Sequence, residues 1–568
     1  MKSVFKDIKH KISRIISPNA GPSAGQYPDW RRLLSDDWDE WQAAVKQAGG
    51  GPRILIATGV GGHVPVVILD SLLSVALTLR GAEVHVLLCD GALPACERLT
   101  IHDTSPGPFA RHGVSKQRCA NCFRHADRMY RSLGLPIHYY SEFITEEQKQ
   151  QAGIISESIS VDEIPRYCMD GLGVGEHAMA GALRFFARGS LTGEKFAEPV
   201  LRHYLKAALL TAYAAANCMK KYNFLAASFH HGIYIPQGVV GEVARRLDVR
   251  VANWSVAYRK KSFIFSHHDT YHHTLMSEPV SAWENMEWSD RHETEIMDYL
   301  KSRWKGTNDW IWFHERPQED IDQIVREVGV DFSRPCIGML TNVMWDAQLH
   351  YPANAFPDML EWVVQTIRYF EKRPDLQLVI RIHPAELRGT VKSRQLMVDE
   401  IGKVFPELPH NVFIIPPESQ ISTYAMTSLC NAVIIYGTKT GVELTSMGIP
   451  VIVAGEAWIR NKGLTFDAGS PEEYHHLLER LPLPQRLSED VVKRARKYAF
   501  HFFFRRMIPI DCIELADGFP PYNITKPGIN HFMPGESKGL DVICEGILNK
   551  TAFIYPAESL QREKQHGA

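Results

Sequence analysis

The sequence of 568 residues contains 63 Lys and Arg against 65 Asp and Glu, and 45% of its residues are hydrophobic. This composition excludes a disordered chain, a collagen-like repeat and a small disulfide-rich protein, and the length indicates two or three domains. Because the charges nearly cancel, no overall positive field is present to attract nucleic acid, and we expect no nucleic-acid partner.

The first 17 residues depart from this average, because they contain five Lys and Arg and one Asp. Helical spacing gathers the apolar side chains of this segment on one face, namely Val4, Phe5, Ile8, Ile12, Ile15 and Ile16. Two interpretations are open, an anchor on an anionic membrane surface and a helix that packs on the protein itself. No apolar run is long enough to span a bilayer and no secretory signal pattern is present, so we expect a cytoplasmic protein, peripheral on the inner membrane.

From residue 51 onward, strand patterns alternate with helix patterns. Buried strands are expected at residues 53–58, 83–88 and 224–229. A glycine turn, Gly59–His63, and an apolar helix over 66–79 lie between the first two strands. This order predicts a doubly wound α/β domain over residues 51–330, preceded by a helix and connector over residues 1–50.

A second series of strands and helices begins near residue 335. Strands are expected at residues 335–340, 376–382, 412–415, 432–436 and 451–453, with helices at 356–370 and 421–429. The series predicts a second doubly wound α/β domain over residues 331–490 and a tail, 491–568, that packs back across both domains. Two such domains in tandem place a ligand in a cleft between them, at the carboxyl ends of the strands.

Histidines follow the strand ends of the first domain. His63 ends the glycine turn, where backbone N–H groups and a helix N-terminus attract an anion. His231 follows the strand at 224–229 and is a candidate general base. Further along, Asp269 with His272 indicates either a polar cleft loop or a second metal site.

Two strand ends of the second domain carry side chains suited to phosphate. Arg381 and His383 follow one strand directly, and a guanidinium and an imidazole both hydrogen-bond phosphate oxygens. Thr438 and Thr440 lie in a Gly/Thr loop whose hydroxyl and N–H groups also suit a phosphate. Glu443 is either an acceptor for ribose hydroxyls or an ordinary acidic residue in the first turn of a helix.

With these motifs, residues 335–480 resemble the bacterial capsule polysaccharide biosynthesis family, which includes the Kdo transferases of capsule assembly and related GT-B glycosyltransferases. The likeness is carried by Arg381-Ile-His-Pro-Ala-Glu386, Thr440-Gly-Val-Glu443, Gly448-Ile-Pro-Val451 and the segment from Gly455 to Asp467. It implies a GT-B fold of two Rossmann-like domains, in which the second domain binds a nucleotide-sugar donor. The turn that contains Gly61, Gly62 and His63 is similar to the acceptor-side loop of other GT-B enzymes.

The resemblance implies donor binding at the motifs of the second domain, to which we add their charged neighbours: Arg381, His383, Glu386, Thr438, Lys439, Thr440, Glu443 and Lys462. His63 and His231 are the catalytic candidates on the acceptor side. The expected function is transfer of a sugar from a CMP-nonulosonic acid such as CMP-Kdo, or from an NDP-sugar, to a lipid-linked or growing surface polysaccharide, without a catalytic metal. The alternatives are a sugar-nucleotide epimerase of the same fold and a non-catalytic scaffold of a capsule-assembly complex.

Four cysteines form a separate pattern after the second strand: Cys89, Cys96, Cys119 and Cys122. The spacing of Cys119 and Cys122 presents two thiolates to one metal, and the other two cysteines complete a four-thiolate set. We expect a structural zinc site, with an iron–sulfur cluster as the alternative and four reduced cysteines as the remaining possibility.

Overall fold

The computed structural model describes residues 22–304, 309–310, 317–347, 349, 352–483 and 486–559. The basic amphipathic helix expected within residues 1–17 lies outside these ranges. Within them, no helix combines the length and the apolar character needed to cross a membrane.

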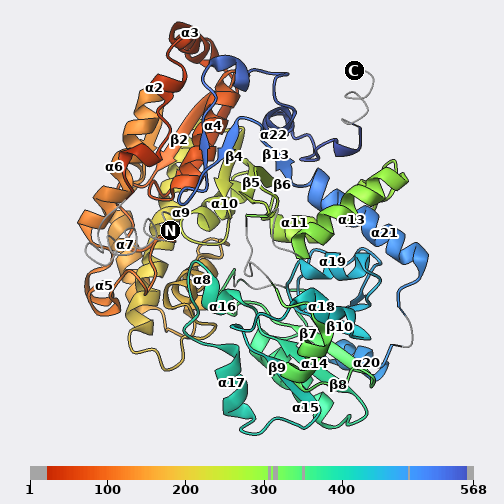
Figure 1. Cartoon of the computed structure of the whole chain (residues 1–568). Coiled ribbons are helices and arrows are strands. Elements are labelled where there is room, and N and C mark those ends of the chain that lie inside the picture. Colours follow the sequence, from red (N-terminus) through yellow and green to blue (C-terminus); the bar gives the residue numbers. More distant parts are fainter. Residues whose placement is uncertain are drawn as a thin grey trace, which may run out of the picture.

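The first sheet has seven strands in the order β13-β6-β5-β4-β1-β2-β3 (Figure 1). Their bounds are β1 Arg53–Gly59, β2 Glu83–Leu88, β3 Ile137–Tyr139, β4 Ala226–His230, β5 Arg250–Val256, β6 Ser262–His267 and β13 Ile508–Pro509. Strands β1 to β5 run parallel, and β6 and β13 are added antiparallel at one edge. The strand order reverses between β1 and β4, which makes this gap the switch point where doubly wound sheets bind ligands.

Helices cover both faces of the first sheet because its central strands are apolar on both sides. In β1, Ile54 and Ile56 face the core formed with α4 (Val64–Thr78), whereas Leu55 and Ala57 face the core formed with α8 (Val174–Phe186) and α9 (Ala197–Tyr222). The other helices of this domain are α2 Trp30–Leu33, α3 Trp38–Ala48, α5 Pro106–His112, α6 Lys116–Leu133, α7 Glu146–Ser158 and α10 Gln237–Arg246.

The second sheet has six parallel strands in the order β12-β11-β10-β7-β8-β9. They span β7 Cys336–Leu340, β8 Gln377–Arg381, β9 Val412–Ile415, β10 Ala432–Ile435, β11 Val451–Val453 and β12 Phe466–Asp467. Its helices are α15 Met359–Glu371, α16 Ala385–Arg388, α17 Met397–Val404, α18 Thr423–Ser428, α19 Thr440–Ser446 and α20 Pro471–Glu479. The switch point of this sheet lies between β7 and β10. Two tandem doubly wound sheets are the GT-B arrangement that the sequence predicts.

The segment between the two sheets differs from the expected domain division, which ends the first domain at residue 330. Its helices are α11 Tyr271–Ser277, α12 Ser281–Glu284, α13 Asp290–Trp304 and α14 Ile321–Val328. Trp283, Ile296 and Ile324 are fully buried in a core that they share with β10 and α19 of the second domain. Helix α11 still packs on β5 and β6 of the first sheet, whereas α12 to α14 bury their apolar faces against the second domain. The chain therefore joins the second domain after α11.

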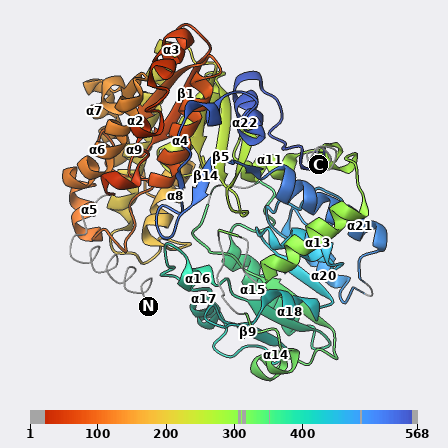
Figure 2. The ribbon, with the colours of Figure 1, turned by 45° about the horizontal axis from the view of Figure 1, so that its top comes forward.

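The tail runs from the second domain back to the first (Figures 1 and 2). Helix α21 (Glu489–Phe500) packs on α13 and α19, then β13 joins the first sheet, and the hairpin β14 (Ile513–Leu515) and β15 (Tyr522–Ile524) follows. The last helix, α22 (Lys538–Asn549), packs on α4, where Arg80 and Asp541 form an ion pair of 2.6 Å.

We expect the tail to contribute to the stability of the first domain. Replacing Ile543 of α22 with Ala removes fully buried apolar volume and should lower the free energy of unfolding by about 2–5 kcal/mol. Ile154→Ala is the matched control, because that side chain is 63% exposed and should leave stability nearly unchanged. Chemical denaturation measures both, and equal effects of the two substitutions would show that α22 is not part of the core.

Candidate functional site

The loops at the carboxyl ends of both sheets line one cavity of about 540 Å³. Its polar lining comes from both domains and the segment between them and includes His231, Tyr271, His272, Arg303, Asp309, Asn342, Asp346, Arg381, His383, Tyr424, Thr438, Lys439, Thr440 and Glu456. The volume lies within the range of small-molecule sites, roughly 300–1,000 Å³. The loops that follow β4, β7 and β10 all reach the cavity, so both switch points open onto it.

Arg381 and His383 line the cavity at the end of β8. The Arg381 guanidinium donates to the carbonyls of Pro416 and Ser419, at 2.5 Å and 3.0 Å, so it also shapes the neighbouring loop. Burial and the nearby Arg388 lower the pKa of Arg381 to about 10. His383 Nδ1 accepts a hydrogen bond from the Ala385 N–H at 3.1 Å, which in the neutral ring leaves the proton on Nε2.

Glu386 and Lys462, two predicted donor-binding residues, do not lie on the cavity wall. The Glu386 carboxyl faces the backbone N–H of Met397 at 3.4 Å, and burial raises its pKa to about 7. The Lys462 ammonium donates to the carbonyls of Met276 and Glu278, at 3.0 Å and 2.6 Å. Both side chains therefore hold neighbouring segments in place, contrary to the expectation of direct contact with a ligand.

The loop between β10 and α19 presents two hydroxyls to the cavity. Thr438 Oγ1 lies 3.1 Å from Thr440 Oγ1 and accepts a hydrogen bond from the Thr440 N–H at 3.3 Å. Lys439, between them, also lines the cavity. Burial and the nearby Arg303 lower the pKa of Lys439 to about 8, against the opposing effect of Glu443.

Glu443 is the buried counter-ion of two cations and is not placed to contact a ribose. Its carboxylate lies 2.6 Å from Lys439 Nζ and 3.3 Å from Arg303 Nη2, and it accepts a hydrogen bond from the Tyr424 hydroxyl. Burial favours the neutral acid, but the two cations outweigh this effect and hold the pKa of Glu443 below its ordinary value. Arg303 also pairs with Asp309. Arg303, Lys439, Asp309 and Tyr424 line one charged wall of the cavity, and Glu443 lies buried behind them.

His231 lines the opposite side of the cavity, after β4. It has a left-handed backbone conformation, with φ of 62°, and its ring stacks on Tyr234 with centroids 5.1 Å apart. Its Nδ1 is buried and has no hydrogen-bond partner among the described residues. Burial lowers the pKa of His231 below its ordinary value, despite the nearby carboxylate of Asp346, so the ring is neutral at pH 7.

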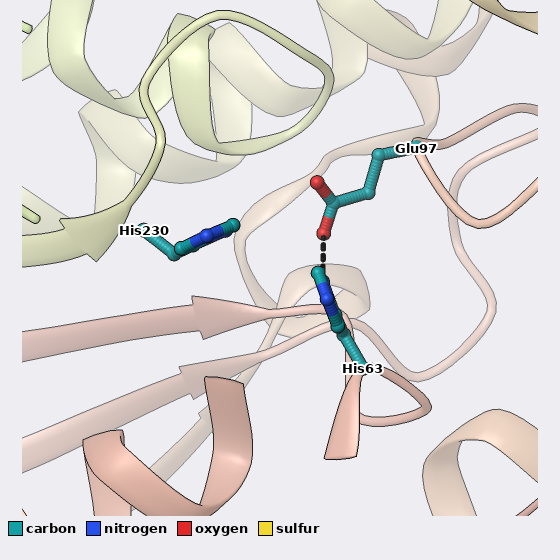
Figure 3. A group of neighbouring side chains, drawn as sticks. All are labelled: His63, Glu97 and His230. Atoms are coloured by element: carbon teal, nitrogen blue, oxygen red, sulfur yellow. Dashed lines mark hydrogen bonds and ion pairs between the residues drawn. The ribbon is translucent and has the colours of Figure 1, made fainter. Parts of the chain in front are cut away.

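His63 does not line the cavity but belongs to a group of side chains beside it, with Glu97 and His230 (Figure 3). His63 Nδ1 lies 3.2 Å from Glu97 Oε1, and the rings of His63 and His230 lie 5.2 Å apart, edge to face. The ring of His230 in turn lies 5.6 Å from that of His231. The two catalytic candidates are thus connected through His230, and only His231 reaches the cavity.

The glycine turn has a packing role that the sequence does not indicate. A side chain at Gly61 would lie 2.8 Å from the carbonyl oxygen of Cys122, and one at Gly62 would lie 3.0 Å from the sulfur of Cys122. The Gly62 N–H also donates to that sulfur at 3.0 Å. Because Gly61 and Gly62 have no side chain, α6 can pack closely against the turn. From the sequence, a ligand was instead expected to lie against these glycines.

Three side chains at the site, Tyr234, Asp346 and Glu456, were not found from the sequence. The Tyr234 hydroxyl donates to Asp346 at 2.9 Å and joins the first domain to the loop after β7. His273 of α11 pairs with Asp269 at 2.9 Å and with Glu456 of the second domain at 3.2 Å. The hydrogen bonds to these carboxylates raise the pKa of His273 to about 10. The polar loop over 267–273 thus includes an ion pair with the second domain.

The second domain matches a known family. Residues 334–499 match the sequence profile of the family described as "Capsule polysaccharide biosynthesis protein". The match covers less than a third of the chain, from β7 to α21. No curated protein matches the sequence. The family segment contains every predicted donor-binding residue, from Arg381 to Lys462, and the cavity walls formed by the loops after β7, β8 and β10.

Solved structures similar to this chain include transferases and an epimerase. The KpsC "beta Kdo 2,4 transferase" of Thermosulfurimonas dismutans is 12% identical over 55% of this chain and 88% of its own, with a TM-score of 0.32. A glycosyltransferase from Rickettsia africae ESF-5 is 11% identical over 88% and 99%, with a TM-score of 0.27. The UDP-GlcNAc 2-epimerase of Neisseria meningitidis, bound to UDP-GlcNAc, is 9% identical over 78% and 94%, with a TM-score of 0.23. The function proposed below is built on the family segment and on the geometry of the cavity.

The buried ion cluster predicts a large stability effect. Glu443→Gln leaves the two cations Arg303 and Lys439 without their shared anion and should cost about 3–5 kcal/mol of unfolding free energy. Glu146→Gln is the control, because Glu146 forms an exposed pair with Lys149 and should have little effect. Denaturant titration compares the two variants, and a Glu443→Gln protein as stable as the control would contradict the counter-ion role.

Proposed function

We propose that the protein is a glycosyltransferase that moves a sugar from a nucleotide-activated donor to a lipid-linked or growing surface polysaccharide. The observation that carries this proposal is the cavity between the two domains, whose second-domain wall is built by the capsule biosynthesis segment. That wall presents hydroxyl, imidazole and cationic groups at the ends of three parallel strands. Such a set suits the phosphate of a nucleotide leaving group.

The donor phosphate is assigned to the second-domain wall. Thr438 and Thr440 supply hydroxyl donors, and His383 supplies its Nε2 proton. Lys439 and Arg303 add positive charge, which their shared anion Glu443 partly neutralises. The site therefore attracts the phosphate of a CMP-linked or NDP-linked sugar by hydrogen bonds from pre-positioned groups, and these strengthen as negative charge develops on the leaving phosphate.

The acceptor is assigned to the first-domain wall, where His231 lies. A neutral imidazole on the cavity wall is suited to accept a proton. In the transfer, the acceptor hydroxyl loses its proton to His231 as its oxygen forms the bond to the anomeric carbon. The bond between that carbon and the phosphate oxygen breaks, and the electron pair leaves with the nucleotide.

Donor binding predicts nucleotide-dependent stabilisation. A ligand that binds only the folded state stabilises it, and a tighter ligand stabilises it more. Among CMP, UDP, GDP and dTDP, the nucleotide that the site prefers should therefore raise the melting temperature of the full chain most. Thr438→Val removes a hydroxyl donor to a charged phosphate and should weaken that nucleotide about tenfold or more. Thr294→Val, on the exposed face of α13, is the control. A melting temperature that none of the four nucleotides changes would overturn the donor site.

The pKa of His231 predicts the pH dependence of transfer. The base form is the neutral ring, and a pKa below 6.5 keeps that form populated down to more acidic pH, so kcat should fall only below pH 6.5. His231→Asn, which tolerates the left-handed backbone, should lower kcat by roughly 10²–10⁴-fold and remove this acidic limb.

Kinetics with an acceptor glycan measure both effects, and His476→Asn, an exposed histidine of α20, is the control. A profile with its acidic limb unchanged in His231→Asn would exclude His231 as the base. Epimerisation of the nucleotide sugar without an acceptor would instead identify the protein as an epimerase.

A further inference from the structure

Four thiols gather at the carboxyl edge of the first sheet. Cys89 and Cys96 lie in the loop after β2, and Cys119 and Cys122 lie in the first two turns of α6. Electrostatic interactions connect each of the four sulfurs with the other three, and none of the four forms a disulfide. Two segments that are separate in the sequence therefore direct four cysteines toward one small region.

Backbone N–H groups point at these sulfurs. Gly62 donates to Cys122 at 3.0 Å, Gly91 and Leu93 donate to Cys89, and Arg98 donates to Cys96. Such hydrogen bonds stabilise the thiolate form, which is the form that binds metals. Four thiolates at these positions would bring four negative charges into one partly buried region.

Without a cation, this charge is unfavourable. All four side chains are partly buried, so their thiolates would lose part of their solvation and repel one another. Four adjacent thiolates are stable in such a place only when a positively charged group lies among them.

The spacing of the sulfurs distinguishes between the two thiolate-bound groups expected from the sequence. In a tetrahedral zinc site with Zn–S bonds of 2.3 Å, the sulfurs lie about 3.8 Å apart. Among the described residues, the ligand atoms of His63, Glu97 and His230 all lie within 4.8 Å of one another. No three of the four cysteine sulfurs lie that close together. Every set of three sulfurs therefore includes a pair more than 4.8 Å apart, which is wider than the zinc tetrahedron allows.

We propose that Cys89, Cys96, Cys119 and Cys122 together bind one iron–sulfur cluster. The iron atoms of an iron–sulfur cluster are bound by four cysteine thiolates. Because these thiolates bind different iron atoms, their sulfurs lie farther apart than the sulfurs around a single ion. The cluster holds α6 and the loop after β2 against Gly62, and thereby fixes the turn that carries His63. Its role is structural, and its presence does not depend on the reaction that the cavity performs.

The metal content of the full-length protein, purified without oxygen, tests this proposal. We expect iron and acid-labile sulfide in equal amounts, and a visible absorption that bleaches on reduction. Zinc in place of iron would overturn the proposal, and so would a protein that takes up no iron when reconstituted with ferrous iron and sulfide.

Substitutions then assign the ligands. Cys96→Ser should lose most of the iron and the visible absorption, whereas Cys168→Ser, which changes an exposed cysteine outside the group, should retain both. If Cys96→Ser fails to fold, the wild-type iron and sulfide content still decides the proposal. Full iron content in soluble Cys96→Ser and Cys122→Ser proteins would exclude these cysteines as ligands and overturn it.

Discussion

The site depends on one constraint, which is that parallel strands deliver the chain to the same edge of a sheet. In both domains the strand order reverses beside the first strand, so two adjacent loops diverge there and leave room for a ligand. The loops after β4, β7 and β10 reach a single cavity. Residues far apart in the sequence, such as His231 and Thr438, therefore face each other because of topology.

A second layer of buried charge holds this arrangement together. Glu443 would be costly in its buried position without Arg303 and Lys439, and the three are stable only as a set. The ion pair of His273 with Glu456 and the hydrogen bond of Tyr234 to Asp346 join the domains on either side of the cavity. These contacts within the protein fix the shape of the site before a donor binds.

Much of the fold is predictable from local patterns. The apolar runs at 335–340 and 412–415 correspond to β7 and β9, and the first glycine turn does connect β1 to α4. Apolar strands between amphipathic helices determine a doubly wound sheet, whatever the distant sequence contains. The motifs at Arg381 and Thr438 lie on the cavity wall because a residue that follows a parallel strand must emerge at that edge.

What could not be predicted depends on long-range partners. The sequence around Arg303 does not indicate that its guanidinium pairs with Glu443. Glu443 was therefore expected to contact ribose, whereas the structure shows it as a counter-ion. Gly61 and Gly62 carry the pattern of a ligand loop, but their close neighbour is Cys122, from a helix much later in the chain. The return of β13 to the first sheet is likewise a pairing between distant segments, and local periodicity does not encode it.

The most direct test of the central claim is a crystal structure of the protein with its preferred nucleotide. The account predicts the phosphate in the cavity, within hydrogen-bonding distance of Thr438, Thr440 and His383, and the base against the second domain. A nucleotide bound outside the cavity, or with its phosphate away from these three side chains, would contradict the assignment of this cavity as the donor site.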